Sequence, residues 1–207
     1  MRELPMFPLG NPLLPGMVLP LRLFEPRYLQ LYADIIDSTR EFGVVLIERG
    51  IESRDDAATF DVGCVASIVG SGINDDGTVG LITVGRRRIR VDKWLESDPY
   101  PRALVTDLDD EPLSDRGLNS VRAAAHRIPD LLNTAAKLDS EVSTEVPELA
   151  ADPVVAIYQI AQMSGLQSLD LQKILETPDA DTRAALVEAK VEETLELIRL
   201  QLEVGEG

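Results

Sequence analysis

Closely spaced prolines restrict how this chain can begin to fold. Five of them lie in the run from Pro8 to Tyr28: Pro8, Pro12, Pro15, Pro20 and Pro26. Because the proline ring fixes φ, such a run loses less conformational entropy when it is held in one shape. The run is therefore suited to hold a binding surface, since a rigid surface loses little entropy when a ligand binds.

Short apolar segments alternate with glycine, proline and aspartate turns through the first half of the chain. We expect strands at 4–7, 17–24, 42–47, 62–73, 78–84, 86–91 and 103–108, and a loop at 50–59. Pro20 places the second strand at a sheet edge or a bulge, because proline cannot donate a ladder hydrogen bond. The pair Asp76-Gly77 predicts a tight hairpin, because both residues tolerate positive φ.

One helix is expected among these strands. Residues 25–38 carry apolar side chains at near-helical spacing, with Pro26 in the first turn, where proline is tolerated. Six or more short strands with a single early helix indicate a small closed or half-closed barrel.

The spacing of apolar residues becomes helical in the second half. Asp152 is suited to cap a helix that has Pro153 at its first position, and Gly165 is suited to end it. We expect helices at 118–132, 153–164 and 168–175, and a last one that opens at Asp179 or Asp181. The sequence predicts an α+β fold, with a β-rich part over 1–112 and a helical bundle over 113–207.

The net charge of −16 bears on which partners the chain can have. Both halves are acidic, whereas a nucleic-acid-binding surface is usually basic, so nucleic acid is not an expected partner. No run approaches the roughly 20 apolar residues of a membrane span, and the first residues do not resemble a signal peptide. We therefore expect a soluble, cytoplasmic protein without a membrane partner.

Residues that could carry chemistry are few. Cys64 is the only cysteine, which excludes an intrachain disulfide, and it lies in an apolar run that favours a buried, inert thiol. His126 is the only histidine, which argues against a histidine triad or a multi-histidine metal site. We interpret the acidic cluster at 107–111 as a solvated turn and not as a cation site. No metal, cofactor or catalytic residue is expected.

The one basic cluster comprises Arg86, Arg87, Arg88 and Arg90. On a strand, Arg86, Arg88 and Arg90 would share one face. They could bind phosphate or an acidic peptide, but in so acidic a chain ion pairs with neighbouring carboxylates are favoured.

The run from Phe7 to Tyr28 resembles the start of the Lon protease N-terminal domain. The family pattern is a Pro-Leu near the start, a Pro-Gly turn, a central Leu-Pro-Leu and then Phe-Glu-x-Arg-Tyr, and this run contains every part of it. The segment from Asp76 to Val91 is similar to a later hairpin of the family, and the remainder of the chain is compatible with it.

This resemblance implies a PUA-like β pseudo-barrel followed by a helical bundle, and a role in contacting protein substrates. The ATPase and Ser–Lys peptidase modules follow this domain in full-length Lon. We expect a stand-alone, non-enzymatic form that lacks both, with polypeptide clients or a protease as partner. The oligomeric state is not predicted.

The expected binding residues lie in the same run: Leu13, Leu14, Met17, Phe24, Glu25, Arg27 and Tyr28. The turn from Leu13 to Met17 is either tucked under the barrel or exposed as an apolar patch, and we favour it as the place of function. Two alternatives stay open. One is an RNA-binding module that uses Arg86, Arg88 and Arg90, and the other is a peptidase with a Ser–Lys dyad, although no serine is indicated.

Overall fold

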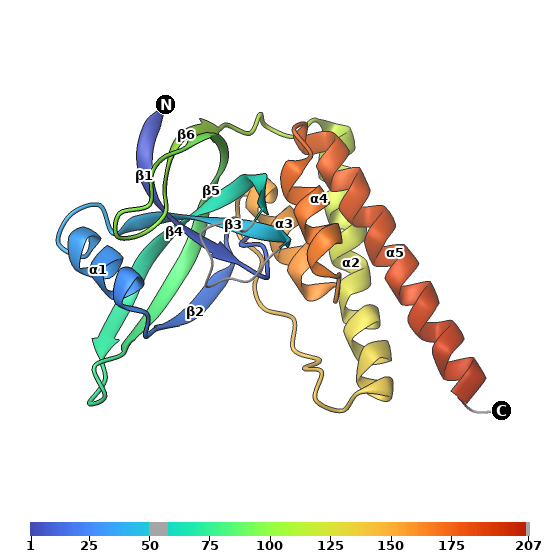
Figure 1. The fold of residues 1–207 in the computed structure, drawn as a ribbon. Helices are drawn as coiled ribbons and strands as arrows, with labels where there is room; N and C mark the ends of the chain where they lie inside the picture. Colours follow the sequence, from blue (N-terminus) through green and yellow to red (C-terminus); the bar gives the residue numbers. More distant parts are fainter. Residues whose placement is uncertain (50–57, 206–207) are drawn as a thin grey trace. The chain divides into compact units, whose positions relative to one another are not determined.

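The computed structural model describes residues 1–49 and 58–205 (Figure 1). The chain forms two compact units, Met1–Asp109 and Asp110–Gly207, called here the β unit and the helical unit. The expected boundary, near Pro112 to Ser114, lies a few residues further along the chain. Most of the predicted loop at 50–59 falls outside the described residues. Among the described helices, none has both the length and the apolar character that crossing a membrane requires.

The β unit contains one helix and a mixed sheet. Its elements are β1 (Arg2–Leu9), β2 (Val18–Leu23), α1 (Pro26–Ile35), β3 (Glu41–Arg49), β4 (Ala58–Ile73), β5 (Val79–Trp94) and β6 (Arg102–Leu108). The strand order is β2-β5-β4-β3-β1-β6, and β6 also pairs with β5. The hydrogen-bonded order therefore returns on itself, and β2 alone stands outside the ring of strands.

The proline-rich run forms the elements that its sequence predicts. Among the described strands β2 pairs with β5 alone, so Pro20 lies in an edge strand, as expected. Glu25 is the N-cap of α1 in an extended conformation, and Pro26 occupies the first helical position. The helix ends at Ile35, a little before the expected end, and buries Tyr28, Leu31 and Ile35.

The hairpin between β4 and β5 turns at Gly77, whose φ is +79°, as the Asp76-Gly77 pair predicts. The prediction of two separate strands at 78–84 and 86–91 is wrong, because these residues form one continuous strand, β5. Gly85 lies inside it and exchanges hydrogen bonds with Gly16 and Met17, so the ladder continues where the sequence predicts a break.

Two apolar clusters form the core of the β unit. The larger one packs α1 and the β1 and β2 ends against β3, β4 and β5, and it includes Phe7, Leu13, Leu23 and Tyr28. The smaller one includes Met6, Val65 and Ile89. Aliphatic side chains supply most of both, in keeping with the aromatic content of 4%.

The helical unit contains α2 (Asp115–Leu138), α3 (Pro153–Met163), α4 (Ser168–Glu176) and α5 (Ala180–Gly205). Asp152 caps α3 through the amide of Val154, and Gly165 follows its end with a φ of +66°, as expected. The N-cap of α4 is Gln167, so the helix begins at Ser168, as expected. The last helix opens at Asp179, whose carboxylate accepts from the Thr182 amide at 3.0 Å.

The long helices α2 and α5 run side by side in the same direction (Figure 1). The Arg127 and Asp130 side chains of α2 form ion pairs with Glu192 and Arg199 of α5. Arg183 is fully buried, donates to the Asp110 carboxylate at 2.8 Å, and lies 5.1 Å from the centre of the Tyr158 ring. The sequence gives no sign of this buried cation, because its partners come from distant segments.

Candidate functional site

An apolar pocket of about 180 Å³ opens in the β unit where β1 and β2 end and α1 begins. Its lining comes from three short segments: Phe7–Leu9, Leu21–Glu25 and Tyr28. Leu21–Glu25 and Tyr28 follow the turn from Leu13 to Met17, whereas Phe7–Leu9 comes before that turn. The pocket therefore brings Phe24, Glu25 and Tyr28, three expected binding residues, together with Phe7–Leu9 of β1, which were not among the expected binding residues.

Aromatic rings form the floor and the rim of this pocket. The Phe7 and Tyr28 rings are stacked with their centres 4.0 Å apart, and both side chains are almost fully buried. The Phe24 side chain, by contrast, is 68% exposed. A large exposed aromatic ring beside a concave apolar surface is typical of sites that bind another molecule.

The charged residues near the pocket are already engaged with one another. Glu25 accepts a hydrogen bond from Arg27 at 3.0 Å, and the Arg27 guanidinium lies 4.6 Å from the centre of the Tyr28 ring. Arg22 donates to Asp76 at 2.6 Å. These contacts pair the charged side chains of Arg22, Glu25 and Arg27 beside an apolar cavity.

The turn from Leu13 to Met17 does not provide the exposed apolar patch that we favoured. Leu13 and Leu14 are 1% and 0% exposed, so they cannot contact a partner in this conformation. The Gly16 amide donates to the Gly85 carbonyl at 2.8 Å, and the Gly85 amide donates to the Met17 carbonyl at 2.9 Å. This docking holds the turn against β5, and of its apolar side chains only that of Met17 is partly exposed.

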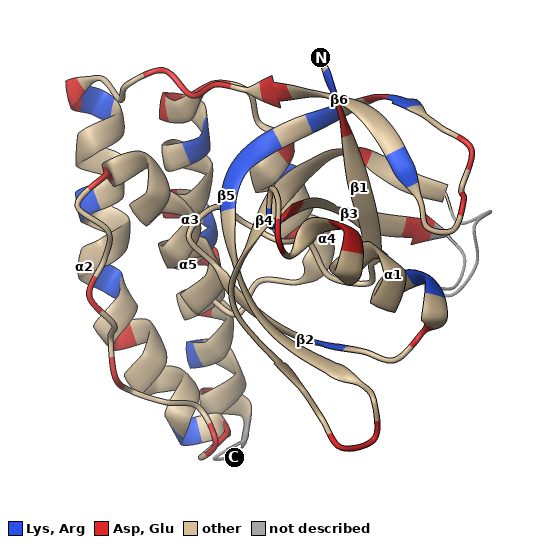
Figure 2. Ribbon diagram, turned by 90° about the vertical axis from the view of Figure 1, so that its left-hand side faces the viewer, with Lys and Arg blue, Asp and Glu red and all other residues tan. Residues whose placement is uncertain are grey.

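The basic cluster lies along β5, which is blue over this stretch in Figure 2. Its side chains do not form a single exposed face. Arg86 and Arg90 are exposed, whereas Arg88 is 2% exposed. A register shift against β4 falls between Gly85 and Arg88, and it interrupts the strand alternation between Arg86 and Arg88. The expectation of one shared face is therefore wrong for Arg86, whereas Arg88 and Arg90 lie in an unbroken register opposite Cys64 and Val62. Ion pairing, the favoured interpretation, is confirmed for Arg90, which binds Asp92 at 3.1 Å, and for Arg87.

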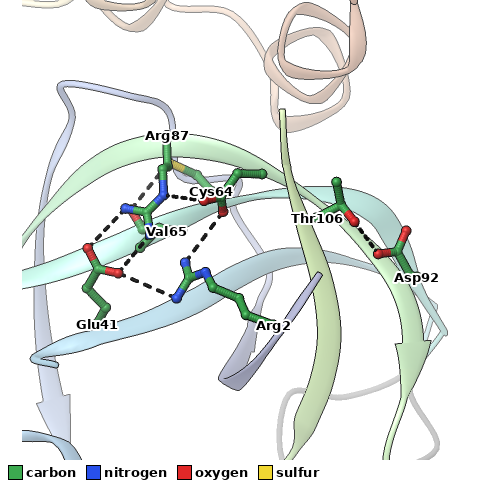
Figure 3. A network of polar contacts seen from close by, with 8 residues as sticks. Arg2, Glu41, Cys64, Val65, Arg87, Asp92 and Thr106 are labelled. Atoms are coloured by element: carbon green, nitrogen blue, oxygen red, sulfur yellow. Dashed lines mark hydrogen bonds and ion pairs between the residues drawn. The ribbon is translucent and has the colours of Figure 1, made fainter. Parts of the chain in front are cut away.

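Arg87 belongs to an ion-pair network that joins four strands (Figure 3). It contacts Glu41 of β3 and Asp107 of β6, and Arg2 of β1 contacts the same two carboxylates. Asp107 thus serves in an ion-pair network and not in a solvated acidic cluster. Across residues 1–49 and 58–205, no three histidine, cysteine, aspartate or glutamate side chains gather as a metal site requires.

Cys64 lies close to this network and is fully buried (Figure 3). Burial raises the pKa of its thiol to about 12. The expected burial is confirmed, and a thiol that stays protonated at neutral pH is a poor nucleophile.

The helical unit has an apolar surface of its own on α5. Leu197, Leu200 and Val204 are between 53% and 82% exposed and line an open hollow with Gln201. Only one helix lines this hollow, so it does not enclose a side chain. The pocket beside Phe24 is the better defined of the two sites.

Comparisons with known proteins place the chain in a family. The profile of the ATP-dependent protease La (LON) substrate-binding domain matches residues 3–190. The chain belongs to this family. The Lon proteases of Cytophaga hutchinsonii and Roseiflexus castenholzii are 26% and 29% identical to it, over 97% and 95% of this chain. Each alignment covers 25% of the relative, so the chain spans about a quarter of these proteases.

Solved structures have the same fold. The crystal structure of a Lon N-terminal domain protein from Xanthomonas campestris matches 91% of this chain and 98% of that one, with a TM-score of 0.65 and 25% identity. The N-terminal domain of the Mycobacterium avium complex Lon protease gives the same TM-score at 18% identity. The family resemblance carried by the run from Phe7 to Tyr28 is confirmed by the profile match and by these relatives.

Proposed function

We propose that this chain is a non-enzymatic module that binds unfolded or client polypeptides at the pocket beside Phe24. The observation that carries the proposal is an exposed phenyl ring next to an apolar pocket of about 180 Å³. Binding hot spots are enriched in aromatic side chains that lie in or beside such pockets. The family description, a substrate-binding domain, supports a polypeptide as the ligand.

The proposal includes an architecture and a setting. The ring of strands, with β2 appended, corresponds to a PUA-like pseudo-barrel, and α2 to α5 correspond to a helical bundle. The protein acts in the cytoplasm on client polypeptides or beside a protease partner. Hydrolysis is not assigned to these residues, because the match covers the substrate-binding part of the relatives and about a quarter of their length.

An RNA-binding function has less support. It would require exposed arginines, but Arg88 is buried and both Arg87 and Arg90 are paired with carboxylates. The net charge of −16 also opposes binding to a polyanion.

Overlapping short peptides from an unfolded test protein can be used to test polypeptide binding, with Phe24→Ser as the site variant. Loss of one buried phenyl contact corresponds to roughly 1.5–3 kcal/mol, so we expect affinity to fall about tenfold or more. Val18→Ser is a matched control, because Val18 is 54% exposed in β2 but does not line the pocket. Equal affinity of both variants would place the binding surface elsewhere.

A further inference from the structure

The pocket lies at the end of β1, where residues 1–49 and 58–205 place no further strand beside one edge. Phe7 to Leu9 pair with β3 on one side, whereas β6 pairs only with Arg2 to Pro5. The Met6 amide faces the β6 side, because it donates to the Pro101 carbonyl at 2.8 Å. Backbone groups alternate along a strand, so Pro8 faces the same side as Met6. Pro8 has no N–H, and this edge therefore offers no donor beside the pocket.

The opposing edge belongs to β2 and is interrupted in the same way. The Met17 carbonyl faces β5, because it accepts from the Gly85 amide at 2.9 Å. By alternation, Val18, Pro20 and Arg22 direct their backbone groups away from β5. Pro20 removes the middle donor of these three.

Both edges are therefore poor templates for an added strand. A peptide that extends a sheet exchanges hydrogen bonds with alternate residues of the edge, and those bonds supply its affinity. Proline at outward positions is a device that prevents such pairing. Pro8 occupies such an outward position in the β1 edge that lines the pocket. Pro20 occupies one in β2, next to the part of β2 that lines the pocket.

The size and surroundings of the pocket favour a different mode of recognition. A cavity of roughly 150 Å³ lined by apolar side chains accommodates benzene, and this pocket measures about 180 Å³. The nearby charges of Arg22 and Glu25 are paired with Asp76 and Arg27, which leaves apolar contact as the main interaction.

We infer that the pocket binds one bulky apolar side chain of a polypeptide and does not add the polypeptide as a strand. The inference rests on the proposed function and specifies its ligand as a phenyl or branched aliphatic side chain. The residues around that side chain contribute little to affinity, because the two edges lack the backbone N–H donors that would bind the peptide backbone.

A set of four blocked peptides tests this inference on the full chain. The host is a nine-residue peptide with a central phenylalanine among serine and glutamine residues. One derivative replaces the phenylalanine with alanine, and two others carry N-methyl groups at the even or at the odd positions on either side of it. Binding is measured by chemical-shift changes of the labelled protein, which detect weak complexes.

We expect the alanine peptide to bind about tenfold more weakly than the host, and both N-methylated peptides to bind within about threefold of it. Loss of binding for one N-methylated peptide, with the alanine peptide unaffected, would show strand addition and overturn the inference while the proposed function stands. If the host peptide and the overlapping peptides of the test protein all fail to bind, the proposed function falls and the inference falls with it.

Discussion

Arg87 holds Glu41 through two parallel hydrogen bonds, with Nη1 to Oε1 at 3.0 Å and Nη2 to Oε2 at 2.9 Å. The same guanidinium donates through Nε to Asp107 at 3.0 Å. Paired contacts of this kind are stronger than single ones because the planar guanidinium matches the carboxylate. Since Glu41 lies in β3, Arg87 in β5 and Asp107 in β6, the three side chains connect strands that are far apart in sequence.

Removing this guanidinium should destabilise the β unit. We expect Arg87→Ala to lower the free energy of unfolding by about 1–2 kcal/mol, a value reduced for the partial exposure of these groups. Arg87→Lys should retain part of the stability, because it keeps the charge but not the paired geometry. Denaturant titration provides the measurement, and Arg86→Ala, an exposed neighbour, is the matched control. Equal effects at both positions would show that the paired geometry contributes nothing.

The stability of the chain should depend on the ionisation of Glu41. The hydrogen bonds from Arg87 lower the pKa of this carboxyl below its usual value. A carboxyl with a lowered pKa in the folded state stabilises the fold above its unfolded pKa, and the contribution is lost as pH falls through the folded pKa. We therefore expect stability to decrease below about pH 4.5. Glu41→Gln should reduce the slope over that range, and unchanged slopes would contradict this assignment.

The docking of the Leu13 to Met17 turn depends on the absence of a side chain at Gly85. A Cβ atom at that position would lie 2.1 Å from the Leu14 carbonyl oxygen, which belongs to the backbone and cannot move aside easily. We expect Gly85→Ala to cost about 1–3 kcal/mol of stability, as is usual when atoms are forced into a packed site.

Gly72 provides the matched control for this substitution. It lies in β4, and nothing approaches within 4 Å of a Cβ added there. We expect Gly72→Ala to change the free energy of unfolding by less than about 0.5 kcal/mol. Thermal or denaturant unfolding of the two variants compares them directly, and equal stability would show that the turn does not need this close approach.

Local sequence signals predicted the individual elements well. Pro20 indicated an edge strand, Pro26 the start of a helix, and Asp76-Gly77 a hairpin turn, and each depends on the dihedral angles that a residue allows. These constraints act over a few residues, so they can be inferred without knowing the rest of the fold.

The site could not be inferred in the same way, because it depends on pairings between distant segments. Leu13 and Leu14 are buried only because Gly85, on a strand much later in the chain, admits their backbone. Phe7 and Leu21 meet at one pocket although β1 and β2 do not pair. Nothing local marks either relationship, and the Phe-Glu-x-Arg-Tyr motif was the only signal that pointed to part of the pocket.

Pro20 should protect the β2 edge from pairing with another chain. Replacing it with valine restores an outward N–H between those of Val18 and Arg22 and adds a residue that favours strands. We expect Pro20→Val to self-associate at concentrations where the original chain does not, as measured by sedimentation velocity. Pro20→Thr restores the same N–H with a more polar side chain and should associate as well. If only the valine variant associates, its apolar surface is responsible, and the missing N–H is not what keeps this edge unpaired.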